Sequence, residues 1–204
     1  MQGFILHTQK IKDEDLIVYI LSSKALIKTY RFYGLRHSSI LNGYKIDFAL
    51  DENPNFLPRL KDVMHLSFTW ILQREKMFLW QEFIRLFYQH LKGIEELDPF
   101  YFELLNESAI KFLKQNPKRV IIDAYVKILE FEGRLHQNFI CFSCEEAIKD
   151  EVTLLRAFLP SHHHCALGYT FNQTKLKEFY KYKNSSIFND DEIEKIYSII
   201  KEGF

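Results

Sequence analysis

The residues best suited to chemistry lie in two short clusters near the end of the chain. Cys141 and Cys144 form a CxxC pair, and His162 and Cys165 form an HxxC pair after 17 intervening residues. Two ligand pairs at this separation are typical of a four-ligand Cys₃His zinc site. Two residues between ligands form a tight turn that directs both side chains at one tetrahedral ion. All three cysteines of the chain lie here, so the spacing predicts a zinc site at the base of a ribbon-like excursion.

Other interpretations of these residues stay open at this stage. The cysteines could be small buried hydrophobic residues, and the histidine run could be a solvated loop. A disulfide framework is disfavoured by the odd number of cysteines. His163 and His164 lie beside His162, so the identity of the fourth ligand is open. Nothing marks Glu145 or Glu146 as a catalytic base, and we therefore expect a structural metal.

The composition is that of a globular chain with large side chains to bury. It has 204 residues, of which 47% are hydrophobic and 16% aromatic, enough for one large domain or two small ones. The formal net charge is zero, which excludes a global attraction to polyanions, so any nucleic-acid surface must be local. We expect no signal peptide and no membrane span, and together with reduced cysteines this predicts a cytoplasmic protein.

The first 72 residues have the pattern of a small β-barrel. Five apolar segments alternate or are rich in β-branched and aromatic residues. These predicted strands are Gly3–His7, Leu16–Leu21, Leu26–Tyr33, Tyr44–Leu50 and Val63–Phe68, with a turn-rich break at Asp51–Pro58. Five short strands in so few residues predict an OB-fold.

Charge is unevenly distributed within this region. No Asp or Glu occurs between Leu16 and Ile46, whereas cations alternate there with aromatic residues. Cations neutralise phosphates and aromatic rings stack on bases, so the pattern indicates a single-strand-binding surface. The alternative is a solvated strand face whose aromatic residues point inward. The predicted DNA-binding residues are Lys24, Lys28, Arg31, Tyr33, Arg36, His37 and Lys45.

From residue 73 to residue 204 the apolar period becomes helical. We expect a helix from about residue 73, a second beginning at Asp98-Pro99, and a third at Val120–Glu132 that ends at Gly133. Two further helices, Thr174–Tyr182 and Asp190–Glu202, follow the zinc excursion at about 136–172. Asn189, with Glu192 three residues on, predicts a capping box at the start of the second. The chain is therefore predicted to be α+β, with an OB-fold domain at 1–72 and a helical domain at 73–204.

A basic cluster lies around the end of the second predicted helix and in the third. It is either a solvated face or a groove for an acidic peptide. Its members are Lys111, Lys114, Lys118, Arg119 and Lys127. No nucleophile elbow, Walker loop, dinucleotide fingerprint or HExxH motif occurs, so we expect no enzymatic activity.

The order of barrel, helices and CxxC resembles the bacterial recombination mediator RecO family. Glu14–Leu21 is similar to the family's acidic-then-apolar second strand, which follows an opening strand like Gly3-Phe-Ile-Leu. Tyr33–Ser39 resembles its Gly-x-Arg segment. The most specific match is Ile128–Cys144, which resembles the family's leucine-rich helix, glycine and CxxC.

The resemblance implies a non-enzymatic protein that binds single- and double-stranded DNA and anneals complementary strands. Such a protein helps to load the RecA recombinase onto strands coated by single-strand-binding protein (SSB). Its implied partners are RecR and the acidic C-terminal tail of SSB. The resemblance also implies that Lys28, Arg31, Arg36 and His37 lie in the DNA-binding part of the barrel. His162 stands where the family usually has a fourth zinc-binding cysteine. An alternative function is a zinc-stabilised adaptor that contacts DNA only within a complex. A zinc-dependent hydrolase is disfavoured, because the sequence places no general base beside the predicted zinc ligands.

Overall fold

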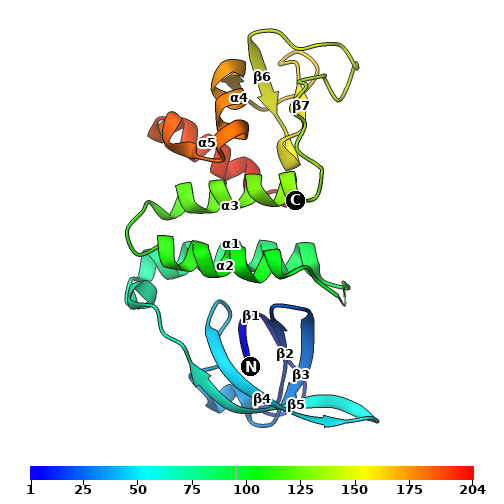
Figure 1. The fold of residues 1–204 in the computed structure, drawn as a ribbon, viewed down its shortest axis with the longest axis vertical. Coiled ribbons are helices and arrows are strands. Elements are labelled where there is room, and N and C mark those ends of the chain that lie inside the picture. The colour runs from blue at the N-terminus through cyan, green and yellow to red at the C-terminus, as the bar shows by residue number, and fades with distance from the viewer. Residues whose placement is uncertain (95) are drawn as a thin grey trace. The chain divides into compact units, whose positions relative to one another are not determined.

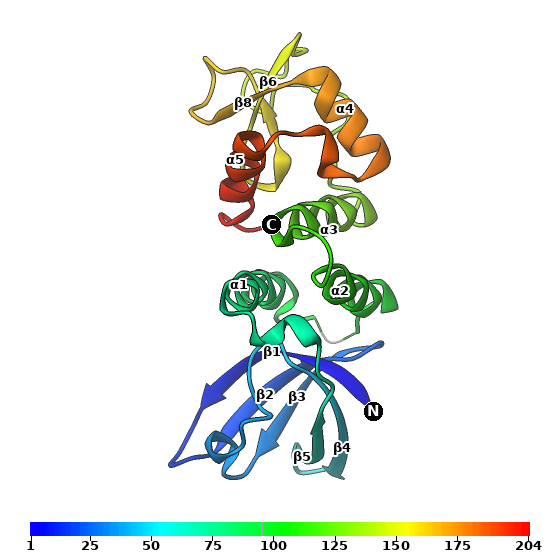
Figure 2. The ribbon, with the colours of Figure 1, turned by 90° about the vertical axis from the view of Figure 1, so that its left-hand side faces the viewer.

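The chain folds into two compact units, Met1–Lys114 and Gln115–Phe204. The structure is a computed structural model that describes residues 1–94 and 96–204. Figures 1 and 2 show a barrel followed by helices, with a smaller β-sheet late in the chain. This order of elements confirms the predicted α+β class.

The first unit begins with a closed five-stranded barrel (Figure 1). Its strands are β1 (Gln2–Lys10), β2 (Leu16–Leu21), β3 (Leu26–Arg31), β4 (Lys45–Asn53) and β5 (Phe56–His65). They are ordered β1-β2-β3-β5-β4, and β1 also pairs with β4 to close the barrel. Only β3 and β5 pair in parallel. This is the OB-fold that the sequence predicts.

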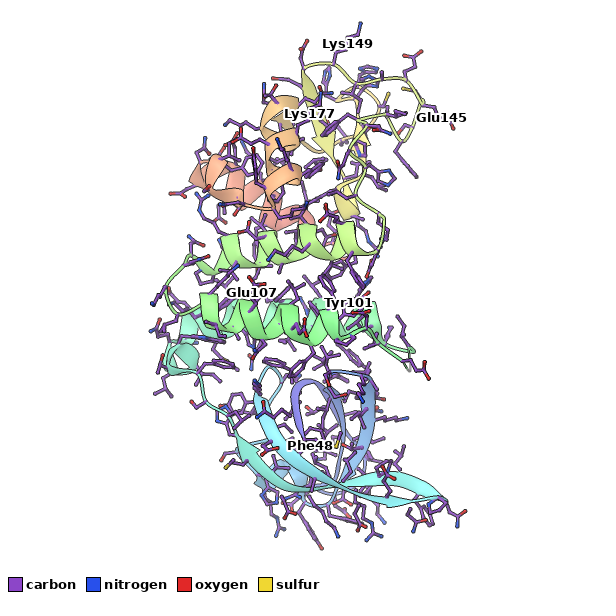
Figure 3. All side chains as sticks on the ribbon, viewed as in Figure 1. Phe48, Tyr101, Glu107, Glu145, Lys149 and Lys177 are labelled. Carbon is purple, nitrogen blue, oxygen red and sulfur yellow. The ribbon has the colours of Figure 1, made fainter. Side chains whose placement is uncertain are left out.

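Alternating apolar side chains fill the barrel. Val18 and Ile20 of β2 are fully buried, and Phe48 of β4 lies within the barrel in Figure 3. Because successive side chains of a strand point to opposite faces, the same strands leave every second position for the surface. The period-2 pattern of the sequence therefore decides which residues a ligand can reach.

The expected break at Asp51–Pro58 is wrong, because strands occupy most of it. β4 continues to Asn53 and β5 begins at Phe56, which leaves only two residues for the turn. Pro58 is accommodated within β5 where the register with β4 shifts, and such an irregularity tolerates a residue without an N–H donor. Similarly, β3 ends at Arg31 and β5 ends at His65, both earlier than expected.

Two helices complete the first unit. They are α1 (Arg74–Leu91) and α2 (Pro99–Lys111), and the short 3₁₀ helices η1 (Gly34–Arg36) and η2 (Thr69–Leu72) precede them. Asp98 caps α2 by accepting a hydrogen bond from the Phe100 N–H, as its Asp-Pro start predicts.

Two buried tryptophans form hydrogen bonds between elements of the first unit. The Nε1 of Trp80 donates to the Gly43 carbonyl at 2.8 Å, and that of Trp70 donates to Ala109 at 2.6 Å.

The second unit combines three helices with a three-stranded antiparallel sheet of order β7-β6-β8. Its helices are α3 (Pro117–Phe131), α4 (Gln173–Tyr182) and α5 (Asp190–Ile200), with 3₁₀ helices η3 (Arg156–Phe158) and η4 (Ser185–Ile187). Its strands are β6 (Glu151–Leu154), β7 (Pro160–Ser161) and β8 (Tyr169–Asn172). The core combines aliphatic side chains with several aromatic ones, among them the fully buried Tyr125, Phe139, Phe158, Phe179 and Tyr180.

The helix boundaries follow capping residues. Asn116 caps α3, so this helix begins three residues before the expected Val120. Gly133 follows α3 with a φ of +68°, as the predicted C-cap requires. At α5 the side chains of Asn189 and Glu192 form the reciprocal capping box that the sequence predicts.

The division into a nucleic-acid-binding domain at 1–72 and a helical domain at 73–204 stays a prediction. The compact units assign α1 and α2 to the same body as the barrel, but compactness alone does not define which segments fold independently. Over residues 1–94 and 96–204, no helix combines the length and apolarity needed to span a bilayer.

Candidate functional site

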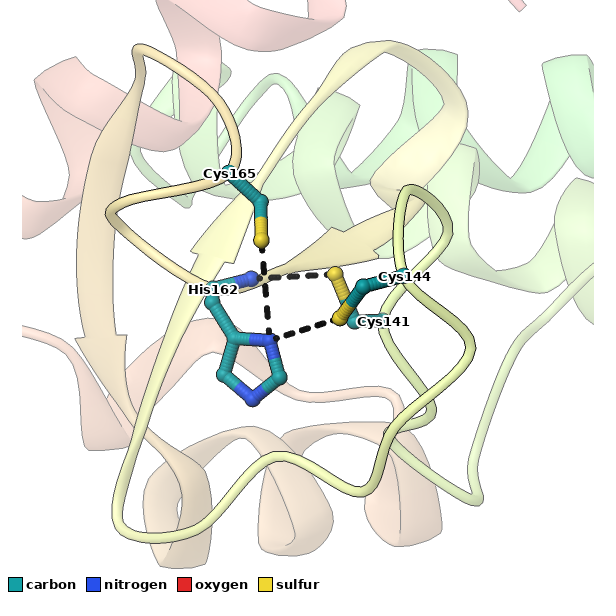
Figure 4. A group of neighbouring side chains, drawn as sticks. All are labelled: Cys141, Cys144, His162 and Cys165. Carbon is teal, nitrogen blue, oxygen red and sulfur yellow. Dashed lines mark hydrogen bonds between the residues drawn. The ribbon is translucent and has the colours of Figure 1, made fainter.

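The four predicted metal ligands meet in the second unit (Figure 4). One ligand atom each from Cys141, Cys144, His162 and Cys165 lies within 4.8 Å of every other. The Nδ1 of His162 is 3.4 Å from the Cys144 sulfur and 3.9 Å from the Cys165 sulfur. The sequence therefore correctly predicts which side chains come together.

Backbone hydrogen bonds shape the CxxC turn and attach it to the sheet. The Cys141 N–H donates to the Glu146 carbonyl at 2.8 Å, and the Glu145 N–H donates back to the Cys141 carbonyl at 2.9 Å. Next to this turn, the Phe142 N–H donates to the carbonyl of Pro160 in β7, also at 2.8 Å. Because β7 leads directly into His162, this bond brings the first ligand pair to the second.

The second ligand pair forms its own turn. The Cys165 N–H donates to the His162 carbonyl at 3.0 Å, which places both side chains on the same side of the chain. The rings of His163 and His164 are exposed. Of the three adjacent histidines, it is His162 whose ring nitrogen joins the sulfurs.

The donor set fits a tetrahedral zinc ion. With Zn–S near 2.3 Å and Zn–N near 2.0 Å, ligands at the corners of a tetrahedron are roughly 3.5–3.8 Å apart. The distances from Nδ1 of His162 to the sulfurs of Cys144 and Cys165 lie close to that range. Three thiols and one imidazole are also the soft and borderline donors that zinc prefers. These four residues could thus hold a metal ion.

Hydrogen bonds prepare one of the sulfurs to carry negative charge. Burial raises the pKa of the Cys141 thiol, but the Ser161 hydroxyl and the N–H groups of His162, Cys144 and Ser143 outweigh burial and bring this pKa to about 5. The His162 N–H lies 3.4 Å from the Cys141 sulfur, and the Ser161 oxygen lies 3.5 Å from it. A thiolate is the form that binds metal, so these donors favour ligation.

The opposite shift occurs at Cys165. Burial raises the pKa of its thiol to about 11, and the neighbouring sulfurs of Cys144 and Cys141 add to the effect. Adjacent thiolates repel one another unless a cation lies between them. A cation bound between the sulfurs would remove this repulsion and favour the thiolate of Cys165.

The carboxylates next to the CxxC pair are not part of the ligand group. Glu145 and Glu146 are exposed, and Figure 3 shows Glu145 and Lys149 on the outer loops of this unit. A catalytic zinc needs an open position with a base directed at it. The arrangement around Cys141 and His162 instead offers four protein ligands, as in closed structural sites.

A second group of predicted residues gathers at one end of the barrel, where β3 ends. The Arg31 guanidinium donates to the Leu60 carbonyl at 2.7 Å and lies 3.3 Å from Nε2 of His37. Arg36 lies over the exposed ring of Tyr33, 5.0 Å from its centroid, and forms an ion pair with Glu14. Four of the seven predicted DNA-binding residues thus share one surface.

Asp15 holds this surface in shape. Its carboxylate accepts hydrogen bonds from the Tyr30 hydroxyl at 2.5 Å and from the Tyr33 N–H at 2.7 Å. Tyr33 has a φ of +51°, an unusual conformation for an aromatic residue, and the bond to Asp15 stabilises it. The hydrogen bond from Tyr30, followed by that from Tyr33, lowers the pKa of Asp15.

The other three predicted DNA-binding residues lie elsewhere. Lys28 is exposed in the middle of β3, with its ammonium 5.9 Å from the centroid of the Tyr19 ring. Lys24 lies in the β2–β3 turn, at the opposite end of β3 from Arg31. Lys45 faces α2 instead, where its Nζ donates to Asn106 at 2.9 Å and lies 5.6 Å from the ring centroid of Phe102.

Sequence reasoning missed a neighbouring part of the barrel surface, at the start of β5. A pocket opens there, lined by Tyr30, Phe32, Phe56, Leu57 and Arg59. The signal that could have found it is Phe56, an aromatic residue directly after the Asn-Pro-Asn turn at 53–55. Because Asp51–Pro58 was expected to be a break without strands, Phe56 was not considered as part of a surface.

The predicted partner-binding cluster is divided between the two units. Lys111 and Lys114 belong to the first unit, and the other three residues belong to the second. Lys111 pairs with Glu107 within α2, and Lys118 pairs with Glu194 of α5. Arg119 donates to the carbonyls of Ser185 and Phe188 and to Asp190. A role for the cluster in partner binding stays a prediction.

Comparison with known proteins agrees with the barrel. Residues 1–71 match the protein-family model described as RecO N terminal. No curated protein matches the chain. The match ends within η2, so it covers the barrel and leaves the metal-ligand group outside it.

Proposed function

We propose that this RecO-like chain acts in DNA repair as a recombination mediator that binds and anneals DNA. The observation that carries the proposal is the end of the OB-fold barrel where Arg31, Tyr33, Arg36 and His37 lie together. OB-folds bind oligonucleotides on the face of strands 2 and 3 and on the adjoining loops. Cations and exposed aromatic rings on that face are the groups that phosphates and bases require.

The proposed partners follow from the same family. They are RecR and the acidic C-terminal tail of SSB, with RecA loading as the consequence of displacing SSB from single strands. We propose that the acidic tail binds cations of the basic cluster, for which Lys114 represents the first unit and Lys127 the second. Arg119 is a weaker candidate, because its guanidinium already donates to two backbone carbonyls.

For the second unit we propose a structural zinc ion held by Cys141, Cys144, His162 and Cys165. When bound, zinc would supply the positive centre that stabilises adjacent thiolates. The protein supplies the two turns, and the donors to the Cys141 sulfur keep that ligand deprotonated. We propose no catalytic step here, since Glu145 and Glu146 are exposed and neither belongs to the ligand group.

The alternative function, an adaptor that meets DNA only within a complex, is favoured by one observation. The chain has 27 basic and 27 acidic residues, so its overall charge does not attract DNA. Binding of RecR or an SSB-tail peptide, without affinity of the isolated chain for DNA, would decide for this adaptor.

The deciding experiment is a fluorescence-anisotropy titration of labelled oligo-dT with the full chain at several salt concentrations. Neutralising two exposed cations of the barrel, as Lys28→Gln with Arg36→Gln, is expected to weaken binding. It should also flatten the dependence of log K on log salt by about 0.7 for each phosphate that the protein no longer neutralises. The matched control is Lys149→Gln with Lys177→Gln, which removes the same charge from the second unit. Equal weakening in both double variants would exclude Lys28 and Arg36 as specific DNA contacts of the barrel.

A further inference from the structure

The pocket between the end of β3 and the start of β5 has a volume of about 370 Å³. That volume lies at the lower end of the range for small-ligand sites, roughly 300–1,000 Å³. It is formed where the two strands run in parallel, with Tyr30 opposite Arg59. The short β4–β5 turn adjoins it and brings Phe56 to its edge.

The walls of this pocket are aromatic and open to solvent. Phe32 is 46% exposed and Phe56 is 74% exposed, so burial in the barrel core does not account for either side chain. The ring of Tyr30 meets that of Phe32 edge to face, with centroids 4.8 Å apart. Exposed apolar side chains that line a pocket are typical of a binding site.

A cation completes the site. The Arg59 guanidinium lies 5.1 Å from the centroid of the Phe32 ring, and Arg31 lies one residue before Phe32. Carboxylates lie near the pocket as well. Asp15 accepts hydrogen bonds from Tyr30 and Tyr33, and Asp51, opposite Arg59 in the β4–β5 register, forms an ion pair with Lys61. Arg31 already donates to the Leu60 carbonyl and does not line the pocket, so Arg59 is the cation that can meet an anion at its edge.

We propose that this pocket receives one unpaired nucleobase, which stacks on Phe32 and Phe56 while Arg59 contacts the adjoining phosphate. The inference rests on the proposed function of the barrel as a DNA-binding domain and names the form of DNA that the pocket selects. A base within a duplex is covered on both faces by its neighbours, so only a single strand can insert one. The pocket would thus make the barrel prefer single strands to duplex DNA.

The test compares Phe56→Ala and Phe32→Ala with the unaltered full chain, using labelled oligo-dT and a duplex of the same length at one salt concentration. Loss of one stacked base is expected to weaken oligo-dT binding about 5- to 150-fold. Duplex affinity and the salt dependence should change little, because the cations remain. Phe78→Ala is the matched control, since this phenylalanine of α1 is 61% exposed but does not line the pocket.

A second variant reports on stacking directly. In Phe56→Trp the new indole should retain affinity and lose fluorescence when oligo-dT binds, against the constant background of the buried Trp70 and Trp80. Phe78→Trp should show no such quenching. This readout does not depend on whether the alanine variants fold normally.

The outcomes separate the two proposals. If the unaltered chain binds neither oligo-dT nor duplex, the DNA-binding function fails. If it binds oligo-dT but Phe56→Ala and Phe32→Ala bind equally well, the base pocket is excluded and the DNA-binding function stands. Equal losses for oligo-dT and duplex would also overturn base insertion. Unchanged DNA binding with weakened binding of RecR would assign the pocket to a protein partner.

Discussion

The Sγ atom of Cys144 lies 3.4 Å from the Nδ1 of His162, although 18 positions separate the two residues in the chain. A backbone hydrogen bond from the Phe142 N–H to the Pro160 carbonyl links the segments that carry the two turns. Three sulfurs this close to one another repel when deprotonated. A bound cation would convert that repulsion into attraction, so the fold of this region should depend on metal.

The first prediction concerns metal content. The purified chain should contain close to one zinc ion per molecule, measured by mass spectrometry of the elements. His162→Ala should lose most of this zinc, because a closed tetrahedral site then lacks a ligand. His163→Ala is the matched control and should retain it, since that ring is exposed and outside the ligand group.

The same site predicts a response to chelators. Metal that binds only the folded state adds about 4 kcal/mol of stability at a thousandfold excess over its dissociation constant. A strong chelator should therefore lower the melting temperature of the unaltered chain and of His163→Ala. It should leave that of Cys144→Ser nearly unchanged. Identical melting curves with and without chelator in the unaltered chain would rule out a structural metal.

The second prediction concerns pH and Asp15. Hydrogen bonds from Tyr30 and Tyr33 lower the pKa of this carboxyl in the folded chain. When the pKa of a carboxyl is lower in the folded chain than in the unfolded chain, its ionised form stabilises the fold. This stabilisation is complete above the pKa of the unfolded chain, about 3.9 for Asp, and it is lost as the pH falls through the pKa of the folded chain. Asp15→Asn should thus be less stable than the unaltered chain at neutral pH, and the difference should shrink below about pH 4.

Thermal unfolding measured between pH 3 and pH 7 tests this behaviour. Asp62→Asn makes the same chemical change at an exposed position of β5 and serves as the control. A stability difference for Asp15→Asn that stays constant across this range would contradict the titration argument.

The third prediction separates structural from partner-binding roles in the basic cluster. Arg119 donates to the carbonyls of Ser185 and Phe188 at 2.6 and 3.0 Å. Hydrogen bonds from a charged group contribute about 1.5–3 kcal/mol, whereas exposed substitutions usually stay within about 0.5 kcal/mol. Urea unfolding should therefore show a clear loss of stability for Arg119→Ala and almost none for Lys114→Ala.

Binding of an acidic SSB-tail peptide should therefore be compared in Lys114→Ala, because a loss of binding in the destabilised Arg119→Ala could come from unfolding. If the cluster docks this tail, Lys114→Ala should weaken binding without altering the unfolding curve. Unchanged binding in Lys114→Ala and in Lys127→Ala would remove the cluster from the partner surface.

Local signals in the sequence predicted much of this structure. The strand Leu16–Leu21 and the α5 capping box of Asn189 and Glu192 were located to the residue, because alternation and capping depend on adjacent residues alone. The metal-ligand group was found for the same reason. Its signature is the chemistry of Cys and His at a spacing that a single turn imposes.

The sequence did not predict which distant strands pair with one another. The pocket at Phe32 and Phe56 exists because β3 and β5 run in parallel, and nothing in either segment specifies the other as its neighbour. Lys45 illustrates the same limit. Its charge marked it as a DNA contact, but the folded chain places it beside Asn106 and Phe102 of α2. Which face of a strand a helix covers is decided by tertiary packing, not by strand pattern.

The last prediction concerns two glycines with nearly the same backbone conformation. Gly43 and Gly93 have φ values of +90° and +89°, so alanine is strained at either position. Among the residues that the structure describes, a new Cβ at Gly93 would meet nothing within 4 Å, whereas at Gly43 it would lie 2.7 Å from the Trp80 ring. That ring also donates its N–H to the Gly43 carbonyl, so it cannot shift without breaking a buried hydrogen bond.

Gly93→Ala should consequently cost about 1–2 kcal/mol of unfolding free energy, the cost of the left-handed conformation alone. Gly43→Ala should cost this amount and a further ~1–3 kcal/mol for overpacking against Trp80. Urea unfolding followed by tryptophan fluorescence measures both, and the emission of Trp80 should change in the native state of Gly43→Ala only. Equal costs for the two variants would mean that the contact between Gly43 and Trp80 does not hold α1 against the barrel loop.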